Sequence, residues 1–158
     1  MRPILPRLIP LLWLLLAGSA SAAGGSLQPK PHPALNPAAV VQLQLAALAR
    51  VDQPQRDAGM AVVFGFASPG NRSLTGPLKR FAAMIREGYP ALLNHRSSTL
   101  APLIMQGDLA LQGVELIDRE GRQHRYVFQL SKQPDGEFKD CWMTDSVLQA
   151  PDDPEVST

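Results

Sequence analysis

Four side chains in the sequence carry groups that serve in acid–base catalysis, namely His95, His124, Tyr126 and Asp145. Histidine changes protonation near neutral pH, because its unperturbed pKa is about 6.5, so His95 is a candidate general base. If the strand face that carries His124 and Tyr126 lines a cavity, these two side chains with Asp145 would suit a small-molecule isomerase or cyclase. Their spacing is generic, however. The alternative for His95 is a structural hydrogen bond at the entry to the first strand.

Four further polar residues are candidates for ligand binding: Asn71, Arg72, Arg80 and Arg96. We expect them to gather, together with His95, around the loops that join the helices to the sheet. The planar guanidinium groups of Arg72 and Arg80 could bind a carboxylate or a phosphate through paired hydrogen bonds. The alternative is structural: Asn71 caps a turn, and Arg72 pairs with a nearby acid or carbonyl group.

The sequence contains no recognisable motif for a metal or a cofactor. His32, His95 and His124 are scattered, without the spacing of a histidine metal site. The methionines have soft sulfur atoms that suit copper(I), but Met84 is expected on the buried side of a helix, which favours a packing role. A glycine-rich phosphate loop and a Gly-x-Ser-x-Gly nucleophile turn are both missing. We therefore expect neither a metal nor a cofactor.

The elements that must position these residues begin with three predicted helices. Residues 36–51 start with Asn-Pro, a side-chain cap followed by a first-turn proline, and carry an apolar stripe. A second helix is predicted from residue 53 to residue 66, and the Ser-Pro-Gly-Asn run over 68–71 should end it. The third helix begins near residues 76–77 and stops at the Gly-Tyr-Pro run over 88–90.

After residue 95 the hydrophobic period changes to two, which predicts β-strands. Strands are predicted over residues 109–117, 122–131 and 137–148, joined by hairpin turns. A weaker strand over residues 98–105 is interrupted by Pro102, which suits the edge of a sheet. Helices followed by an antiparallel meander define an α+β fold. We expect about three N-terminal helices packed on a curved, four-stranded antiparallel sheet.

The composition is that of a single folded domain with balanced charge. Of the 158 residues, 45% are hydrophobic and 18% charged, so a core can be buried. The 15 Lys and Arg against 14 Asp and Glu leave a net charge of +1, whereas nucleic-acid binding rests on clustered basic side chains. We expect no nucleic-acid partner. One cysteine, Cys141, excludes an internal disulfide, and we expect a buried, unreactive thiol.

The first 22 residues have the three parts of a secretory signal peptide. Arg2 and Arg7 precede an apolar run over residues 8–17, and Ala20-Ser21-Ala22 matches a small-residue cleavage site. The alternative is a membrane anchor, but this run is much shorter than the roughly 20 residues that span a bilayer. We therefore expect residues 1–22 to be removed on export to the periplasm, a thylakoid lumen or the extracellular space, with no membrane contact afterwards.

The rest of the chain is expected to form one domain between two irregular ends. Residues 23–35 are rich in glycine and regularly spaced proline, which predicts an extended linker. Residues 150–158 combine two prolines with acidic side chains, which predicts a disordered tail. The folded domain is then expected over residues 36–149.

The order of these elements is similar to that of the nuclear-transport-factor-2-like superfamily, in which a bent antiparallel sheet wraps a long helix to form a cone. Several short runs also resemble an uncharacterised family of small exported or plastid-targeted domains. These runs are residues 66–72, 75–77, 80–81 with Met84, 89–90, 94–96, 133–136 and 141–144. The resemblance extends over nearly all of residues 36–149. It implies a cone-like fold with a pocket between sheet and helices, and it implies no reaction.

A well-patterned domain without a recognisable catalytic spacing favours a binding role. We expect an exported binding or interaction module whose partner is a small molecule or a protein. The outer face of the sheet would allow a homodimer. The alternative is the isomerase or cyclase considered above, which would use a cavity between the sheet and the helices.

Overall fold

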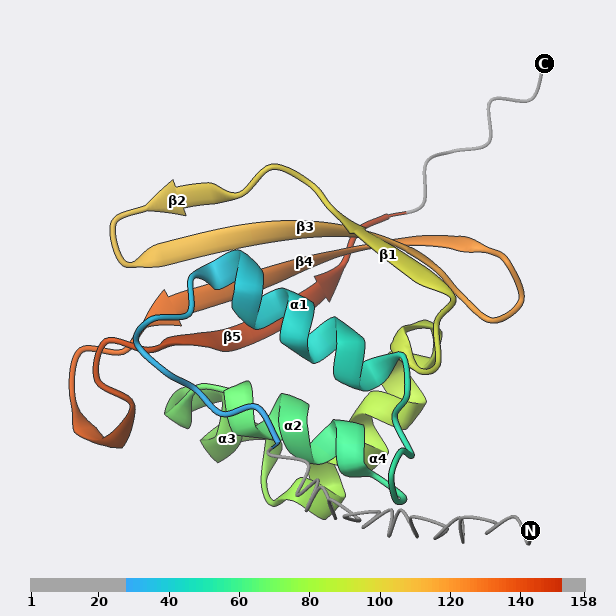
Figure 1. Cartoon of the computed structure of the whole chain (residues 1–158), viewed down its shortest axis with the longest axis horizontal. Coiled ribbons are helices and arrows are strands. Elements are labelled where there is room, and N and C mark those ends of the chain that lie inside the picture. The colour runs from blue at the N-terminus through green and yellow to red at the C-terminus, as the bar shows by residue number, and fades with distance from the viewer. Residues whose placement is uncertain (1–27, 152–158) are drawn as a thin grey trace, which may run out of the picture.

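The structure is a computed structural model, and it describes residues 28–151. Four helices precede an antiparallel sheet of five strands, which confirms the predicted α+β fold (Figure 1). The elements are α1 (Pro37–Leu48), α2 (Ala58–Phe66), α3 (Pro69–Thr75), α4 (Leu78–Gly88), β1 (Ser97–Leu100), β2 (Ile104–Gln106), β3 (Leu109–Ile117), β4 (Gln123–Lys132) and β5 (Trp142–Gln149). Two short 3-10 turns, η1 (Pro90–Leu92) and η2 (Gly136–Phe138), complete it.

The first helix starts where the Asn-Pro pair predicts. The side-chain oxygen of Asn36 accepts a hydrogen bond from the backbone N–H of Ala39 at 2.8 Å, and Pro37 occupies the first turn. The helix ends at Leu48, slightly earlier than predicted, because Asn94 forms hydrogen bonds with the backbone at its C-terminal end. The Asn94 N–H donates to the Leu48 carbonyl, and its side chain accepts from the N–H of Val51.

The number of helices differs from the prediction, because the run predicted to end the second helix starts another one. Ser68 caps α3 by accepting a hydrogen bond from the N–H of Asn71, and Pro69 fills the first turn. The second helix also begins later than predicted, at Ala58. Turns occupy the residues between α1 and α2, held in part by a bond from the N–H of Asp57 to the Asp52 side chain.

The sheet has the order β1-β3-β4-β5, and β2 pairs with β3 beyond β1. The predicted edge strand is divided in two, because proline at 102 interrupts it and both halves pair with β3. The last strand starts at Trp142 rather than at residue 137, where the chain forms the turn η2. The sheet is open, because β5 pairs with β4 and with no other strand within residues 28–151.

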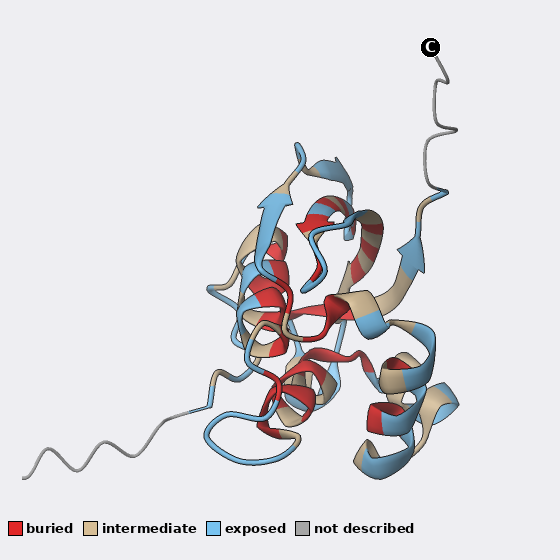
Figure 2. Ribbon diagram, turned by 90° about the vertical axis from the view of Figure 1, so that its right-hand side faces the viewer, coloured by how far each residue is buried: buried red, intermediate tan, exposed pale blue. Residues whose placement is uncertain are grey.

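The helices cover one face of the sheet, as Figure 1 shows, and α1 lies against β3 and β5. The covered face carries Tyr126, Phe128 and Leu130, which are all buried, as the alternation along this strand predicts. Helices α2 and α4 pack beneath α1. Buried residues gather where the two layers meet (Figure 2).

Helices α1 and α2 approach each other closely at Gly59. The Gly59 N–H donates a hydrogen bond of 2.8 Å to the carbonyl of Val51. A Cβ atom at residue 59 would lie 2.3 Å from the carbonyl oxygen of Ala47. Only glycine fits at this point without a shift of backbone.

The junction between α2 and α3 lies along the margin of β5. The N–H of Ser68 donates to the carbonyl oxygen of Thr144 at 2.9 Å, and Ala67 forms a short parallel bridge with the same residue. The side-chain amide of Asn71 donates to that oxygen as well, at 3.1 Å. This contact brings α3 beside the last strand.

Candidate functional site

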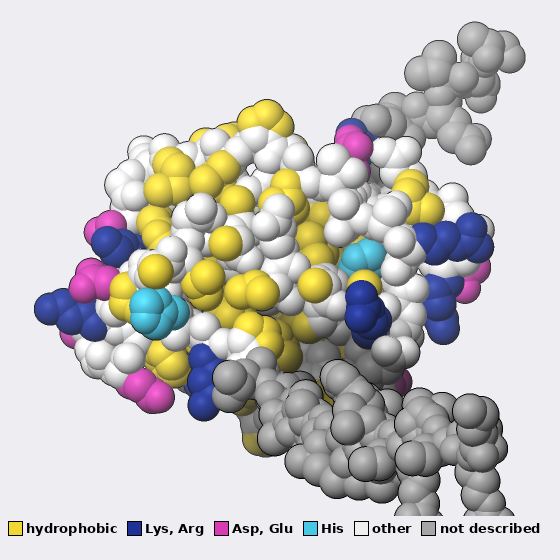
Figure 3. All heavy atoms as spheres, viewed as in Figure 1, with side chains coloured by type: hydrophobic (Ala, Val, Ile, Leu, Met, Phe, Trp, Pro, Cys, Tyr) yellow, Lys and Arg dark blue, Asp and Glu magenta, His cyan; other side chains and the backbone are white. Residues whose placement is uncertain are grey.

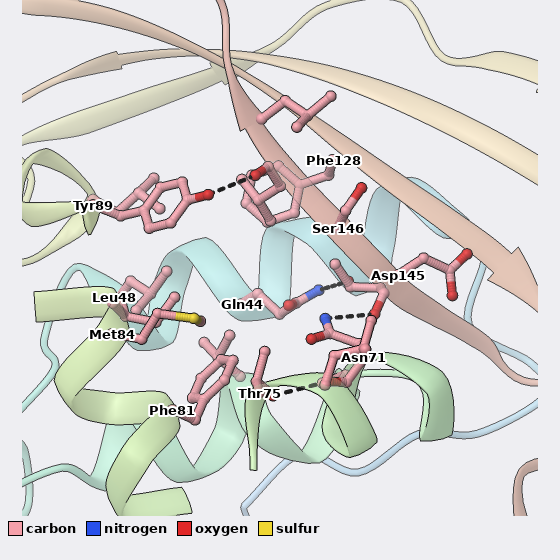
Figure 4. A pocket seen from close by; sticks show the side chains of 18 residues that line it. Gln44, Leu48, Asn71, Thr75, Phe81, Met84, Tyr89, Phe128, Asp145 and Ser146 are labelled. Atoms are coloured by element: carbon pink, nitrogen blue, oxygen red, sulfur yellow. Dashed lines mark hydrogen bonds between the residues drawn. The ribbon is translucent and has the colours of Figure 1, made fainter. Parts of the chain in front are cut away.

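A pocket of about 300 Å³ lies between the helices and the last strand. Its walls come mainly from α3, α4 and β5, with two residues from α1, and Figure 4 shows the side chains that line it. Most of the lining is apolar, and the larger apolar side chains are Leu48, Val63, Phe81, Ile85, Leu92 and Phe128. Leu74 and Met84 lie exposed at the rim. Met84 is 37% exposed, so the expectation that it lies on the buried side of its helix is wrong.

One polar side chain from α1 reaches the pocket without any exposure to solvent. Gln44 is 0% exposed, and its Nε2 donates to the Thr144 hydroxyl at 2.8 Å and towards the Val40 carbonyl at 3.4 Å. Its Oε1 is buried and has no hydrogen-bond partner among residues 28–151. Buried polar atoms are nearly always paired, so this oxygen is the most distinctive feature of the pocket.

Two more hydrogen bonds tie the pocket rim to β5. The Tyr89 hydroxyl donates to the carbonyl of Val147 at 2.9 Å, which joins the segment after α4 to the strand. On the opposite side, the Asn71 amide nitrogen is bound to the strand, as described above. Figure 4 shows Gln44 and Asn71 extending towards the same part of the pocket, from α1 and α3 respectively.

The guanidinium group of Arg72 is engaged within the chain. Its Nε donates to the carbonyl oxygens of Ala67 at 2.9 Å and of Phe64 at 3.1 Å, and one terminal nitrogen donates to that of Gly65. The group also lies over the rings of Phe64 and Phe138, 5.3 and 5.0 Å from their centres. Arg72 therefore binds the carbonyl end of α2, where a cation is favoured.

The expected gathering of polar residues around the helix–sheet loops is not what the structure contains. Asn71 and Arg72 lie on a helix, α3, because Ser68 starts it, while Arg80 is exposed on α4. His95 lies beyond η1, where its Nδ1 is 2.8 Å from the carbonyl oxygen of Leu92. The exposed Arg96 precedes β1, and of the predicted ligand-binding residues only Asn71 lines the pocket.

The four acid–base candidates are also apart from one another. His95 and His124 do not line the pocket, and Tyr126 is buried in the core with its ring centre 6.3 Å from that of Tyr89. Asp145 does line the pocket, but Figure 4 shows its carboxyl group pointing away from the interior. These side chains therefore do not combine into one acid–base site in the pocket.

His124 instead pairs with Asp118 at the turn between β3 and β4. The Asp118 side chain is 2% exposed and accepts hydrogen bonds from His124 Nε2 at 2.8 Å and from Arg122 Nε at 2.9 Å. The N–H groups of Glu120 and Arg122 donate to its other oxygen. Burial by itself raises the pKa of Asp118, but these bonds outweigh it and hold the pKa well below its usual range.

This network predicts a loss of stability in acid. Because the folded-state pKa of Asp118 is lowered, its contribution is present above the unfolded-state value of about 3.9 and is lost as the pH falls towards the folded-state value. Thermal unfolding between pH 7 and pH 3 measures this contribution. We expect Asp118→Asn to lower the melting temperature at pH 7. We also expect the melting temperature of this variant to fall less than that of the wild type as the pH is lowered to 3. The exposed Asp108→Asn is the control, and equal profiles for the two variants would contradict the assignment.

The described residues hold no group of three or more His, Cys, Asp or Glu side chains placed to bind a metal ion. Cys141 is buried, and burial together with the charge of Asp140 raises the pKa of its thiol. Within residues 28–151, no helix is long and apolar enough to cross a membrane. The predicted signal peptide, the first part of the predicted linker (residues 23–27) and most of the predicted tail lie outside these residues.

Surface charge is spread around the edge of the face seen in Figure 3, and its centre is mostly apolar and uncharged. The hairpin of β2 and β3 exposes several large apolar side chains. They are Ile104, Met105, Leu109 and Leu111. Ile104 pairs with Leu111 across the two strands, so Ile104, Leu109 and Leu111 lie on one face of the hairpin, whereas Met105 pairs with Ala110 on the other.

The chain belongs to a family defined as a domain of unknown function (DUF4864), whose model matches residues 34–154. This agrees with the resemblance to an uncharacterised family. The match covers every helix and strand of the fold, from α1 to β5. No curated protein and no solved structure matches the chain. The family has no assigned function.

Proposed function

We propose that the chain is a binding module that holds a small, mostly apolar molecule in the pocket between the helices and β5. The observation that supports the proposal is an apolar cavity of about 300 Å³ within a well-packed domain. Native domains have few voids larger than a water molecule, and ligand pockets start at about 300 Å³. We also propose that the fold is related to the nuclear-transport-factor-2-like cone, in which a cavity lies between the sheet and the helices.

The same pocket does not favour the isomerase or cyclase alternative. Acid–base catalysis needs a side chain within hydrogen-bond reach of the proton that it moves. Asp145 is the one member of the candidate set that lines the pocket, and its carboxyl group points outward. Binding without chemistry is therefore the function that the geometry supports.

A blocking substitution at the rim tests the proposal. Met84 lines the pocket from an exposed position, and Figure 4 shows its sulfur directed into the cavity. Met84→Trp should fill the space while leaving the core intact. Titration with 1-naphthol, a neutral probe of suitable size, is expected to give saturable binding to the wild type and binding at least tenfold weaker to this variant.

The matched control is Ala83→Trp, because Ala83 is exposed on the same helix and does not line the pocket. This variant should bind 1-naphthol like the wild type. The proposal fails if the wild type shows no saturable binding, or if the substitutions at residues 83 and 84 have equal effects.

We further propose that the module is exported to the periplasm or an equivalent compartment. The support is the pattern of residues 1–22, with a basic start, a short apolar run and a small-residue exit. Mass spectrometry of the protein from an exporting host should find the N-terminus at Ala23 or Gly24. An intact Met1 on the soluble protein would refute export.

A further inference from the structure

We infer that the ligand of this pocket is a neutral molecule with a hydroxyl group, anchored between Gln44 Oε1 and the Thr144 hydroxyl. The inference rests on the proposed function and adds the chemistry of the ligand. It starts from the one buried acceptor in the lining that no described residue satisfies.

The contacts of Gln44 fix which end of its amide is free. A backbone carbonyl can only accept hydrogen bonds, so the atom that faces the Val40 oxygen must be the amide nitrogen. The same nitrogen donates to the Thr144 hydroxyl at 2.8 Å. The carbonyl end, Oε1, therefore remains an acceptor, and Figure 4 shows the Gln44 side chain directed to the pocket from α1.

Thr144 supplies the complementary group. Its hydroxyl oxygen accepts the bond from Gln44 and keeps its own proton, for which the described residues provide no hydrogen-bond acceptor. Gln44 and Thr144, joined by this bond, thus offer one acceptor and one donor in the lining. A hydroxyl group both donates and accepts, so it can satisfy the two together.

The rest of the lining favours a neutral ligand. Among the described residues that line it, Asp145 alone carries a charge, and its carboxyl group points outward. A buried charge without a partner is costly, so a carboxylate or an ammonium group would gain nothing in this pocket to offset its lost hydration. An apolar body with one hydroxyl group fits both the walls and the Gln44–Thr144 pair.

Three probes of similar size test the inference on the full chain. They are 1-naphthol, 1-methoxynaphthalene, which lacks the donor, and the anion 1-naphthoate. We expect the wild type to bind 1-naphthol about tenfold tighter than 1-methoxynaphthalene, the factor that one satisfied buried hydrogen bond provides. Binding of 1-naphthoate should be weaker still. Isothermal titration calorimetry at pH 7 gives the three dissociation constants.

The variant Gln44→Met keeps the length of the side chain and removes the acceptor. It should bind the first two probes with equal affinity, whereas Gln42→Met, at an exposed position of the same helix, should retain the tenfold preference. If Gln44→Met does not fold, Thr144→Val is the second variant: because both probes can accept a hydrogen bond from the Thr144 hydroxyl, both should bind more weakly while the preference for 1-naphthol remains, and unchanged binding of both would contradict the anchor.

The outcomes separate the two claims. If none of the three probes binds to the wild type, the proposed function itself fails. If 1-naphthol and 1-methoxynaphthalene bind equally well, the pocket binds apolar molecules without the hydroxyl anchor, and the inference is overturned alone. A preference that survives in Gln44→Met also overturns it, because the acceptor would then lie elsewhere.

Discussion

Replacing Gly59 by alanine is expected to destabilise the fold by about 3 kcal/mol, at the upper end of what overpacking costs. The added Cβ atom would lie 2.3 Å from the Ala47 carbonyl oxygen and 2.9 Å from the Cα of Val51. Both neighbours are backbone atoms, so no side chain can rotate away. Relief requires α1 and α2 to separate, which also weakens the bond from the Gly59 N–H to Val51.

Urea unfolding followed by circular dichroism measures this loss. Gly65→Ala is the matched control, because Gly65 lies on the same helix and a Cβ atom there meets nothing within 4 Å. Alanine favours a helix over glycine by up to about 1 kcal/mol, so the control should be as stable as the wild type or more stable. The close approach of the helices is refuted if both substitutions change the free energy of unfolding in the same direction.

The second large effect is expected at Phe81, on α4. Its side chain is 3% exposed, and its ring lies 5.3 Å from that of Phe64, tilted by 58°. Truncation of a buried phenylalanine costs about 3–5 kcal/mol, and the loss of the ring contact falls within that range. Phe81→Ala should therefore remove much of the stability of a domain of this size.

Met84→Ala is the comparison for Phe81→Ala, because Met84 lies on the same helix and is partly exposed. We expect Met84→Ala to cost about 1 kcal/mol or less. Denaturation midpoints of the two variants and the wild type give the comparison. Similar midpoints for wild type and Phe81→Ala would show that α4 does not pack on α2 as described.

The parts of the fold that the sequence predicts are those set by local signals. Asn36 and Pro37 start α1, and alternation places Tyr126 and Phe128 on the covered face of β4. Ser68 and Pro69 carry the same start signal as Asn36 and Pro37, but the glycine and asparagine that follow them are typical of a loop. Glycine in the first turn costs a helix about 1 kcal/mol, which the Ser68 cap can offset.

The candidate site was harder to predict because its main feature depends on distant residues. Gln44 stands four residues after Val40 and four before Leu48, a helical spacing that marks it as buried and could have singled it out. That its oxygen lacks a partner depends on Thr144, which lies 100 residues further along the chain. No local pattern contains that information. The contacts of Arg72 with residues 64–67, by contrast, are local, and a carbonyl partner was one of its predicted roles.

The junction of α2 and α3 also affects whether the domain can aggregate through its sheet edge. An unpaired strand margin is a template on which a second polypeptide can add a strand, and β5 has such a margin. At Thr144 the outward main-chain oxygen is already taken by Ser68 and Asn71. A second strand must displace both before it can pair along this end of β5. The helix junction therefore protects the domain against edge-to-edge aggregation, and two of the residues in this contact, Asn71 and Thr144, also line the pocket.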